Sequence, residues 1–243
     1  MQKVKAVIAY DGSAYLGFQK QKSTKKTVTY AIEEALSSLQ ITSLIVASGR
    51  TDAGVHATGQ VIHFELPSFW TDLHKLKINL NRKLIDIEFK HISVVPQNFH
   101  ARFSAQKRQY RYLFKTNKPS VFEQKYISYY PASFQSEKLQ EALNSFIGTY
   151  DFQYFCKTGS TPHSTIRTVY KTKYYTHNRD LHIIMFQANG FLRSQVRMMI
   201  AAAMQYAQGE ITLHTLQMQV KHEKKSQSSL ASPEGLYLAK IIY

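Results

Sequence analysis

The sequence predicts an α+β fold made of two halves, each a β-α-β-β-α-β (ferredoxin-like) unit. Short alternating apolar runs indicate strands, and longer runs with apolar residues three and four apart indicate helices. This order of patterns occurs once before residue 100 and again after residue 107. A chain of 243 residues accommodates one large domain or two small ones. We predict a first half at 1–98, a connecting segment at 99–106 and a second half at 107–243.

In the first half, the predicted strand at residues 3–10 alternates lysines with small and branched apolar residues. Thr27 is placed to cap a helix over 27–39, and a second helix is predicted at 71–84. Further strands are predicted at 43–47, 60–65 and 86–95. The first two of these bracket a loop of about ten residues, longer than a hairpin needs.

In the second half, a strand is predicted at 107–116, and residues 126–130 extend it or pair with it. Ser136 is expected to cap a helix over 136–147. The remaining expected elements are a hairpin of strands 166–177 and 181–187 around Asn178, Arg179 and Asp180, helices at 191–208 and 212–221, and a last strand at 236–243.

The charge balance points to a polyanionic partner. Thirty-one Lys and Arg residues face sixteen Asp and Glu residues, a formal charge of +15. Residues 89–122 contain no acid, and aromatic side chains alternate with their basic ones, which favours RNA over a membrane surface. The single Cys156 excludes a disulfide framework. No apolar run is long enough for a signal peptide or a membrane span, so we expect a cytoplasmic protein.

The most distinctive stretch is the loop at residues 48–59, which contains the string Gly-Arg-Thr-Asp-Ala-Gly-Val-His-Ala. Its three glycines allow close approach to a partner, and Arg50 and Asp52 place a cation and a carboxylate two residues apart. The string resembles the active-site motif of the TruA family of tRNA pseudouridine synthases, in its bacterial form. The resemblance implies that Asp52 is the catalytic carboxylate, acting as nucleophile or base at C1′, at C6 or on the 2′ proton.

The resemblance has further implications for fold and activity. The sheets of the two halves are expected to join into a continuous mixed, mainly antiparallel sheet, with the catalytic cleft between the halves. The implied reaction is the isomerisation of uridine to pseudouridine at positions 38 to 40 of the tRNA anticodon stem-loop, without a cofactor or metal. The implied assembly is a homodimer that binds tRNA.

Two other strings extend the expected site. In a strand at 107–116, alternation places Arg108, Tyr110 and Tyr112 on one face, and Tyr110 aligns with the family's active-site tyrosine. The resemblance implies that Tyr110 stacks on the target base or assists proton transfer. Arg197 lies on an otherwise apolar helix face, so a carboxylate partner is expected. In the family that partner is the catalytic aspartate, here Asp52, and Arg50 is expected to fill the space that the flipped base vacates or to hold the flipped nucleotide.

The connecting segment supplies the remaining expected contacts. If it is extended, His100 and Arg102 point the same way. The segment resembles one that contacts tRNA in the family, and Leu236, next to the C-terminal signature, is expected to line the base pocket. The substrate-binding residues implied in this way are Phe99, His100, Ala101, Arg102, Phe103, Tyr110 and Leu236. The chain departs from the family pattern at Phe18, at Thr29 and at 83–87, where a proline is missing.

Two other classes of function were considered. A non-catalytic RNA-binding protein with paired RRM-like sheets would carry glycines in its aromatic strand, and residues 107–116 have none. A metal-dependent phosphodiesterase needs ligands, but His56, His63, His91 and His100 follow no ligand spacing. We expect His63, on a strand face, to belong to the core. The sequence therefore favours the synthase and predicts no metal site.

Overall fold

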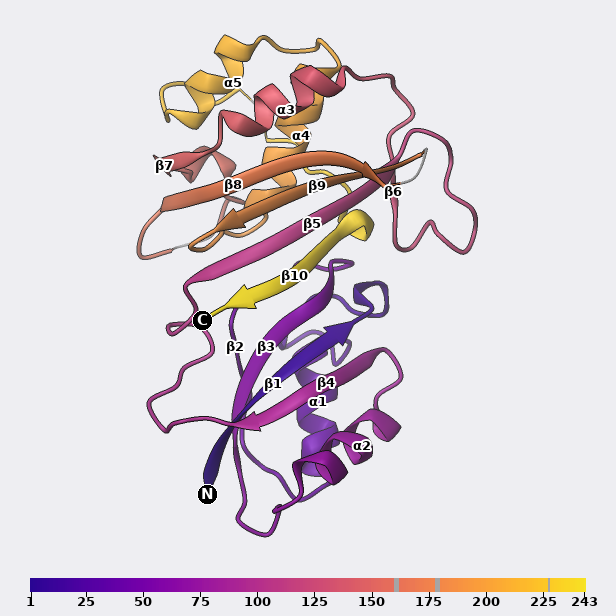
Figure 1. Ribbon diagram of the computed structural model, residues 1–243, viewed down its shortest axis with the longest axis vertical. Helices are drawn as coiled ribbons and strands as arrows, with labels where there is room; N and C mark the ends of the chain where they lie inside the picture. Colours follow the sequence, from indigo (N-terminus) through magenta and orange to yellow (C-terminus); the bar gives the residue numbers. More distant parts are fainter. Residues whose placement is uncertain (160–161, 178–179, 227) are drawn as a thin grey trace. The chain divides into compact units, whose positions relative to one another are not determined.

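The computed structural model describes residues 1–159, 162–177, 180–226 and 228–243. It contains two compact units, and both combine helices with a sheet, so the predicted α+β class is confirmed (Figure 1). Unit 1 comprises Met1–Gln106 together with Tyr237–Tyr243, and unit 2 comprises Lys107–Leu236. The expected joining of the two sheets and the cleft between the halves stay predictions. No helix in the described part of the chain is long and apolar enough to cross a membrane.

Unit 1 has a sheet with the strand order β4-β1-β3-β10, in which β10 (Leu236–Ile242) is the last strand of the chain, and β2 pairs with β3 as well. β1 runs antiparallel to both β3 and β4, whereas β10 runs parallel to β3. The order of elements along the chain is the predicted β-α-β-β-α-β. Its elements are β1 (Gln2–Tyr10), α1 (Val28–Ser37), β2 (Val46–Ala47), β3 (His56–Leu66), α2 (Leu73–Lys83) and β4 (Ile87–Val94), with the 3-10 helix η1 (Gly12–Ala14) after β1.

Both helices of unit 1 begin at side-chain caps. The hydroxyl of Thr27 accepts a hydrogen bond from the Tyr30 N–H, which confirms the predicted cap of α1. The Asp72 carboxylate accepts one from the Lys75 N–H at the start of α2. The buried faces of the helices, at intervals of three and four residues, consist of Val28, Ile32, Ala35 and Leu36 in α1 and Leu76 and Leu80 in α2.

The strands around the glycine-containing loop differ from their predicted bounds. β2 is only two residues long, and β3 begins at His56, inside the stretch expected to be a loop. β3 starts this early because its first residues pair with strands from distant parts of the chain. His56 pairs with Tyr237 of β10, and Ala57 pairs with Tyr10 of β1. The loop proper therefore spans residues 48–55, and we call it the motif loop.

Unit 2 has a sheet with the strand order β5-β9-β8-β7, and β6 pairs in parallel with β5. Helices α3, α4 and α5 lie on one side of these strands (Figure 1). The elements are β5 (Lys107–Lys115), β6 (Ser128–Tyr129), α3 (Ser136–Asn144), β7 (Gly148–Asp151), η2 (Gln153–Phe155), β8 (Ile166–His177), β9 (Leu181–Ala188), α4 (Gln195–Ala207), α5 (Leu213–Val220) and η3 (Pro233–Gly235), before β10 (Leu236–Ile242).

Two expectations for the helices of unit 2 are wrong. Ser136 is the first residue of α3 and not its cap; Gln135 holds the cap position, and the Ser136 hydroxyl lies 3.3 Å from the Tyr174 hydroxyl. α4 begins at Gln195 and not at Phe191, because Ser194 has a left-handed backbone conformation with φ of 59°. In the predicted hairpin, both strands are present, and Asn178 and Arg179 of its turn lie outside the described residues.

The residue ranges that make up the two units differ from the predicted division at two places. Residues 99–106 belong to unit 1, and so does most of the last strand, which was assigned to the second half. The physical reason is hydrogen bonding, because β10 pairs with β3 and the Gln106 N–H donates to the Ile242 carbonyl.

Candidate active site

The motif loop is held by the backbone of residues 11–18, which we call the first loop. The Phe18 N–H donates to the Thr51 carbonyl over 3.1 Å, and the Gly54 N–H donates to the Tyr15 carbonyl over 3.4 Å. The two loops meet so closely that a Cβ atom on Gly12 would lie 2.1 Å from the Val55 carbonyl oxygen. Only glycine permits this approach. The backbones of the motif loop and the first loop are therefore in direct contact.

Arg50 and Asp52 lie on either side of Thr51 in the motif loop. Arg50 is exposed and Asp52 is half-buried, whereas Thr51 between them is buried. The Thr51 hydroxyl points inward and lies 2.8 Å from the Tyr10 hydroxyl. A half-buried carboxylate on a loop anchored through its inward-facing neighbour can act as a nucleophile or base toward a substrate bound from outside.

His56, at the end of the motif loop, has a structural role. Its Nδ1 accepts a hydrogen bond from the Gly12 N–H over 3.0 Å and also lies 3.3 Å from an Asp11 carboxylate oxygen. A nitrogen that accepts from an amide carries no proton, so we assign the neutral ring protonated at Nε2 and treat the Asp11 approach as proximity. The ring also stacks on Tyr237, with centroids 4.7 Å apart. Within the described ranges, no group of three or more His, Cys, Asp or Glu side chains is arranged to hold a metal ion.

The segment expected to contact tRNA is a compact turn and not an extended strand. The Ser104 N–H donates to the His100 carbonyl, and the His100 Nδ1 accepts from the N–H groups of Arg102 and Phe103. The prediction that His100 and Arg102 point the same way in an extended chain is therefore wrong. The Phe103 ring is 76% exposed, stacks on His100 at 4.3 Å and lies beneath the Arg102 guanidinium at 5.6 Å. Arg102 and Phe103 are the large side chains that this turn presents to solvent, beside the exposed Ser104.

The turn is anchored beneath its exposed residues. The buried His63 accepts a hydrogen bond from the Ala101 N–H, and the Tyr243 hydroxyl donates to the Ala101 carbonyl over 2.8 Å. Ala101 is fully buried, so its contribution to any RNA contact comes from its place in the turn. His63 belongs to the core, as predicted. The Phe99 ring packs on Tyr243 at 5.0 Å.

The remaining expected site residues lie in unit 2. Tyr110 is buried in β5 and meets Phe191 edge to face at 5.2 Å. Tyr112 is buried and Arg111 exposed, as the predicted alternation requires. Arg197 occupies the first turn of α4, where its Nε donates to the Ala231 carbonyl over 2.6 Å. Leu236 is buried directly after η3.

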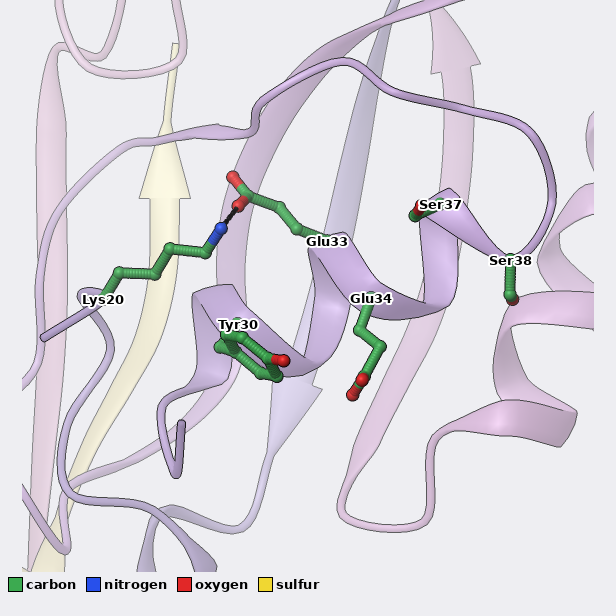
Figure 2. A pocket seen from close by; sticks show the side chains of 6 residues that line it. All are labelled: Lys20, Tyr30, Glu33, Glu34, Ser37 and Ser38. Carbon is green, nitrogen blue, oxygen red and sulfur yellow. Dashed lines mark ion pairs between the residues drawn. The ribbon is translucent and has the colours of Figure 1, made fainter. Parts of the chain in front are cut away.

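A cavity of about 510 Å³ lies beside α1 and contains none of the expected site residues. Figure 2 shows its lining residues, with Lys20 paired to Glu33 next to the Tyr30 ring. Lys20 and Lys25 lie over that ring at 5.7 and 5.6 Å. These contacts attach the lysine-rich segment after the first loop to α1. We assign them a structural role.

Comparison with known proteins tests the resemblance to a family. The sequence profile described as tRNA pseudouridine synthase matches residues 6–104 and 142–243, which include the motif loop, the turn at 99–104, Arg197 and Leu236. The chain belongs to the tRNA pseudouridine synthase family. It is therefore an isomerase that forms pseudouridine in tRNA, and the non-catalytic alternative is not favoured.

Individual relatives agree with this membership over their full length. The chain is 40% identical over 249 residues to tRNA pseudouridine synthase A of Helicobacter hepaticus, covering all of both chains. It is 37% identical over 244 residues to the enzyme of that name from Campylobacter jejuni, again covering both chains. A chain of a solved Cbf5–Nop10–Gar1 complex matches 83% of this chain and 45% of its own length, with 12% identity and a TM-score of 0.37, a likeness too weak to carry an argument.

Sequence reasoning missed the residues that hold the motif loop from inside, above all Tyr10, Ser48 and Gln60. The local sequence pattern did not identify them, because Tyr10 and Thr51 lie 41 residues apart in the sequence, and Gln60 and Ser48 lie 12 apart. Phe18, noted only as a departure from the family pattern, also belongs to this support. Its ring is buried 6.0 Å from the Tyr10 ring, and its carbonyl accepts from the N–H of Thr29, the second departure.

Proposed function

We propose that Asp52 is the catalytic nucleophile of the family reaction in this chain and that it needs no cofactor. In the conversion of uridine to pseudouridine, the bond from N1 to C1′ breaks and a bond from C5 to C1′ forms. The proton lost from C5 is balanced by the one gained at N1, so no redox partner is required. The observation that carries the proposal is that Asp52 is half-buried in a motif loop anchored through its neighbour Thr51.

We propose roles for three further residues. The target base must leave its stack, at a cost of a few kcal/mol. Arg50, exposed beside Asp52, holds the flipped nucleotide, and Tyr110 stacks on the base or assists proton transfer. Arg197 pairs with Asp52 and keeps the carboxylate ionised. The hydrogen bond from its Nε to Ala231 supports this role, because it fixes the plane of the guanidinium.

The tRNA itself is proposed to contact two basic surfaces. One is the turn of unit 1 that presents Arg102 and Phe103, where Phe99 and His100 complete the aromatic cluster. The other is the face of the unit 2 sheet opposite Tyr110 and Tyr112, which we call the basic face. There Lys107 lies over Tyr170 at 5.0 Å, and Lys173 over Tyr175 at 5.4 Å. The pairing register places Arg111 on the same face as Lys173, because both residues pair with Met185 of β9.

The composition of this sheet supports a polyanionic ligand for the basic face. The sequences of β5, β8 and β9 contain no Asp or Glu, and strand alternation with the pairing register places Lys107, Arg111, Lys171 and Lys173 on the basic face. Such a strand set, with tyrosines among the cations, suits contacts to phosphates and sugars. Leu236 is proposed to line the base pocket.

The finer features of the function are also proposals. We propose that the modified uridines are those at positions 38 to 40 of the anticodon stem-loop and that the enzyme is a cytoplasmic homodimer. The resemblance of the motif loop and the full-length similarity to bacterial relatives support them.

Sequencing of pseudouridine in unmodified tRNA transcripts tests the positions. We expect pseudouridine at 38, 39 or 40 in transcripts with uridine there, and none in the anticodon arm when cytidine replaces it. Modification elsewhere in the tRNA, with 38 to 40 untouched, would contradict the proposed substrate position and leave the family activity intact.

A further inference from the structure

The motif loop is held from inside by two buried side chains of neighbouring strands. Tyr10, at the end of β1, is 5% exposed, and its hydroxyl lies 2.8 Å from the Thr51 hydroxyl. Gln60, in β3, is fully buried. Its amide oxygen accepts from the Ser48 hydroxyl over 2.6 Å, and its amide nitrogen donates to the Gly49 carbonyl over 2.8 Å.

Gln60 places a polar amide at a buried position of β3. Its neighbours in β3, Val61 and Ile62, are apolar and equally buried. Burying an amide costs free energy unless it is hydrogen-bonded, so an apolar residue would serve packing alone at least as well. The amide oxygen of Gln60 accepts a local bond from the Val61 N–H, and its two bonds to the motif loop go to Ser48 and Gly49, the residues that precede Arg50.

The loop itself needs such support. A Cβ atom on Gly49 would meet nothing within 4 Å, so close packing does not hold this residue, and glycine adds backbone freedom. The bond from Gln60 to the Gly49 carbonyl restrains that freedom directly before Arg50. Thr51 is restrained next, through its carbonyl by Phe18 and through its hydroxyl by Tyr10. Asp52 follows at once, so rotation about Thr51 would move its carboxylate.

We propose that Tyr10 and Gln60 are positioning residues that fix the Asp52 carboxylate in its reactive orientation through Thr51, Gly49 and Ser48. The inference rests on the proposed function, in which Asp52 is the catalytic nucleophile. Catalysis is sensitive to such support, because a displacement of about 1 Å costs on the order of 100-fold in rate. Burial raises the pKa of the Tyr10 phenol well above its usual range, so its hydroxyl keeps its proton at working pH.

The test is the single-turnover rate of pseudouridine formation, with tRNA affinity and melting temperature measured on the same proteins. Tyr10→Phe and Thr51→Val each remove one hydroxyl and keep the side-chain shape, and Gln60→Met replaces the amide by an apolar chain of similar length. We expect each to slow the reaction about 10- to 100-fold, with the tRNA dissociation constant within about two-fold of wild type. Thr51→Ser keeps the hydroxyl and should stay within about three-fold of the wild-type rate.

Two comparisons separate positioning from general stability. Thr172→Val removes a hydroxyl from a threonine of unit 2 that is buried to a similar degree, and we expect it to leave the rate unchanged. The double variant Tyr10→Phe/Thr51→Val should be no slower than the slower single variant, because both hydroxyls belong to one interaction. A wild-type rate in Tyr10→Phe and Thr51→Val would overturn the proposal. So would an equal loss of rate in Thr51→Ser and Thr51→Val, or a loss in Thr172→Val as large as theirs.

The variant Asp52→Asn distinguishes the failure of this inference from that of the proposed function. If Asp52→Asn is inactive while Tyr10→Phe, Thr51→Val and Gln60→Met react at the wild-type rate, only the positioning role is refuted. If Asp52→Asn retains the wild-type rate, the catalytic assignment fails, and the positioning role fails with it.

Discussion

The buried imidazole of His63 accepts a hydrogen bond from the backbone N–H of Ala101 over 3.1 Å. This bond ties the centre of β3 to the turn that presents Arg102 and Phe103. Burial, then the neighbouring His100 and Lys3 side chains, lower the pKa of His63 to about 4, which keeps the acceptor nitrogen unprotonated at neutral pH. The orientation of the proposed tRNA-contacting turn therefore depends on a neutral core histidine.

This relationship predicts a pH dependence of stability. The pKa of His63 is lower in the folded state than in the unfolded chain, where it lies near 6.5. Between these values only the unfolded state binds the proton, so stability falls as pH drops from about 6.5 to about 4, by up to about 1.4 kcal/mol per pH unit. His63→Asn keeps an acceptor for the Ala101 N–H and removes the titration, and denaturant unfolding should show a shallower slope for it than for wild type. An unchanged slope would contradict the assignment. Because His182 also has a lowered pKa, the difference between the two proteins is the informative quantity.

The basic face predicts how tRNA binding depends on salt. Lys171→Ala and Arg111→Ala each remove one proposed phosphate contact and should lower the slope of log affinity against log salt by about one. Lys138→Ala is the matched control, because this lysine lies on α3, where it packs over Tyr206. Filter binding at several salt concentrations measures all three. Slopes equal to wild type in Lys171→Ala and Arg111→Ala would remove the basic face from the RNA footprint.

Arg197 is predicted to need its guanidinium and not only its charge. A lysine cannot donate to Ala231 and present a planar fork to a carboxylate at the same time. We expect Arg197→Lys to slow pseudouridine formation about 100-fold. Arg193→Lys, at an exposed position before α4, should react at the wild-type rate. Equal rates for Arg197→Lys and wild type would argue against its proposed pairing with Asp52.

Replacing two glycines around the motif loop by alanine is predicted to lower the free energy of unfolding by different amounts. In Gly12→Ala the new Cβ atom would lie 2.1 Å from the Val55 carbonyl oxygen, so the motif loop must shift. We expect a loss of about 2 kcal/mol or more in unfolding free energy, together with loss of activity. Gly49→Ala meets no atom within 4 Å and should stay within about 1 kcal/mol of wild type. Chemical denaturation measures both, and similar stabilities for the two variants would contradict the described contact.

Local signals in the sequence predicted much of the fold. The cap at Thr27 is an example, because cap and recipient are three residues apart. Features that depend on distant partners escaped prediction. β3 starts early because it pairs with β10, and β10 joins unit 1 for the same reason. The four-residue β7 was missed because Gly148–Asp151 shows no alternation.

The same distinction holds for the candidate site. Asp52 could be proposed from the sequence because its motif is contiguous, and the family profile matches the stretch that contains this motif. The support of the motif loop could not be predicted, because Tyr10 and Thr51 lie 41 residues apart in sequence, and Gln60 and Ser48 lie 12 apart. Hydrogen bonds of this kind become visible only when strands have been placed side by side.

The most direct test of the central claim is pseudouridine formation by Asp52→Asn under single-turnover conditions, with tRNA binding measured on the same protein. Asp72→Asn is the matched control, since its side chain caps α2 and asparagine caps helices equally well. We predict that Asp52→Asn binds tRNA with wild-type affinity and forms no pseudouridine, whereas Asp72→Asn retains the wild-type rate. Conversion by Asp52→Asn at the wild-type rate would contradict the assignment of Asp52 as the catalytic nucleophile.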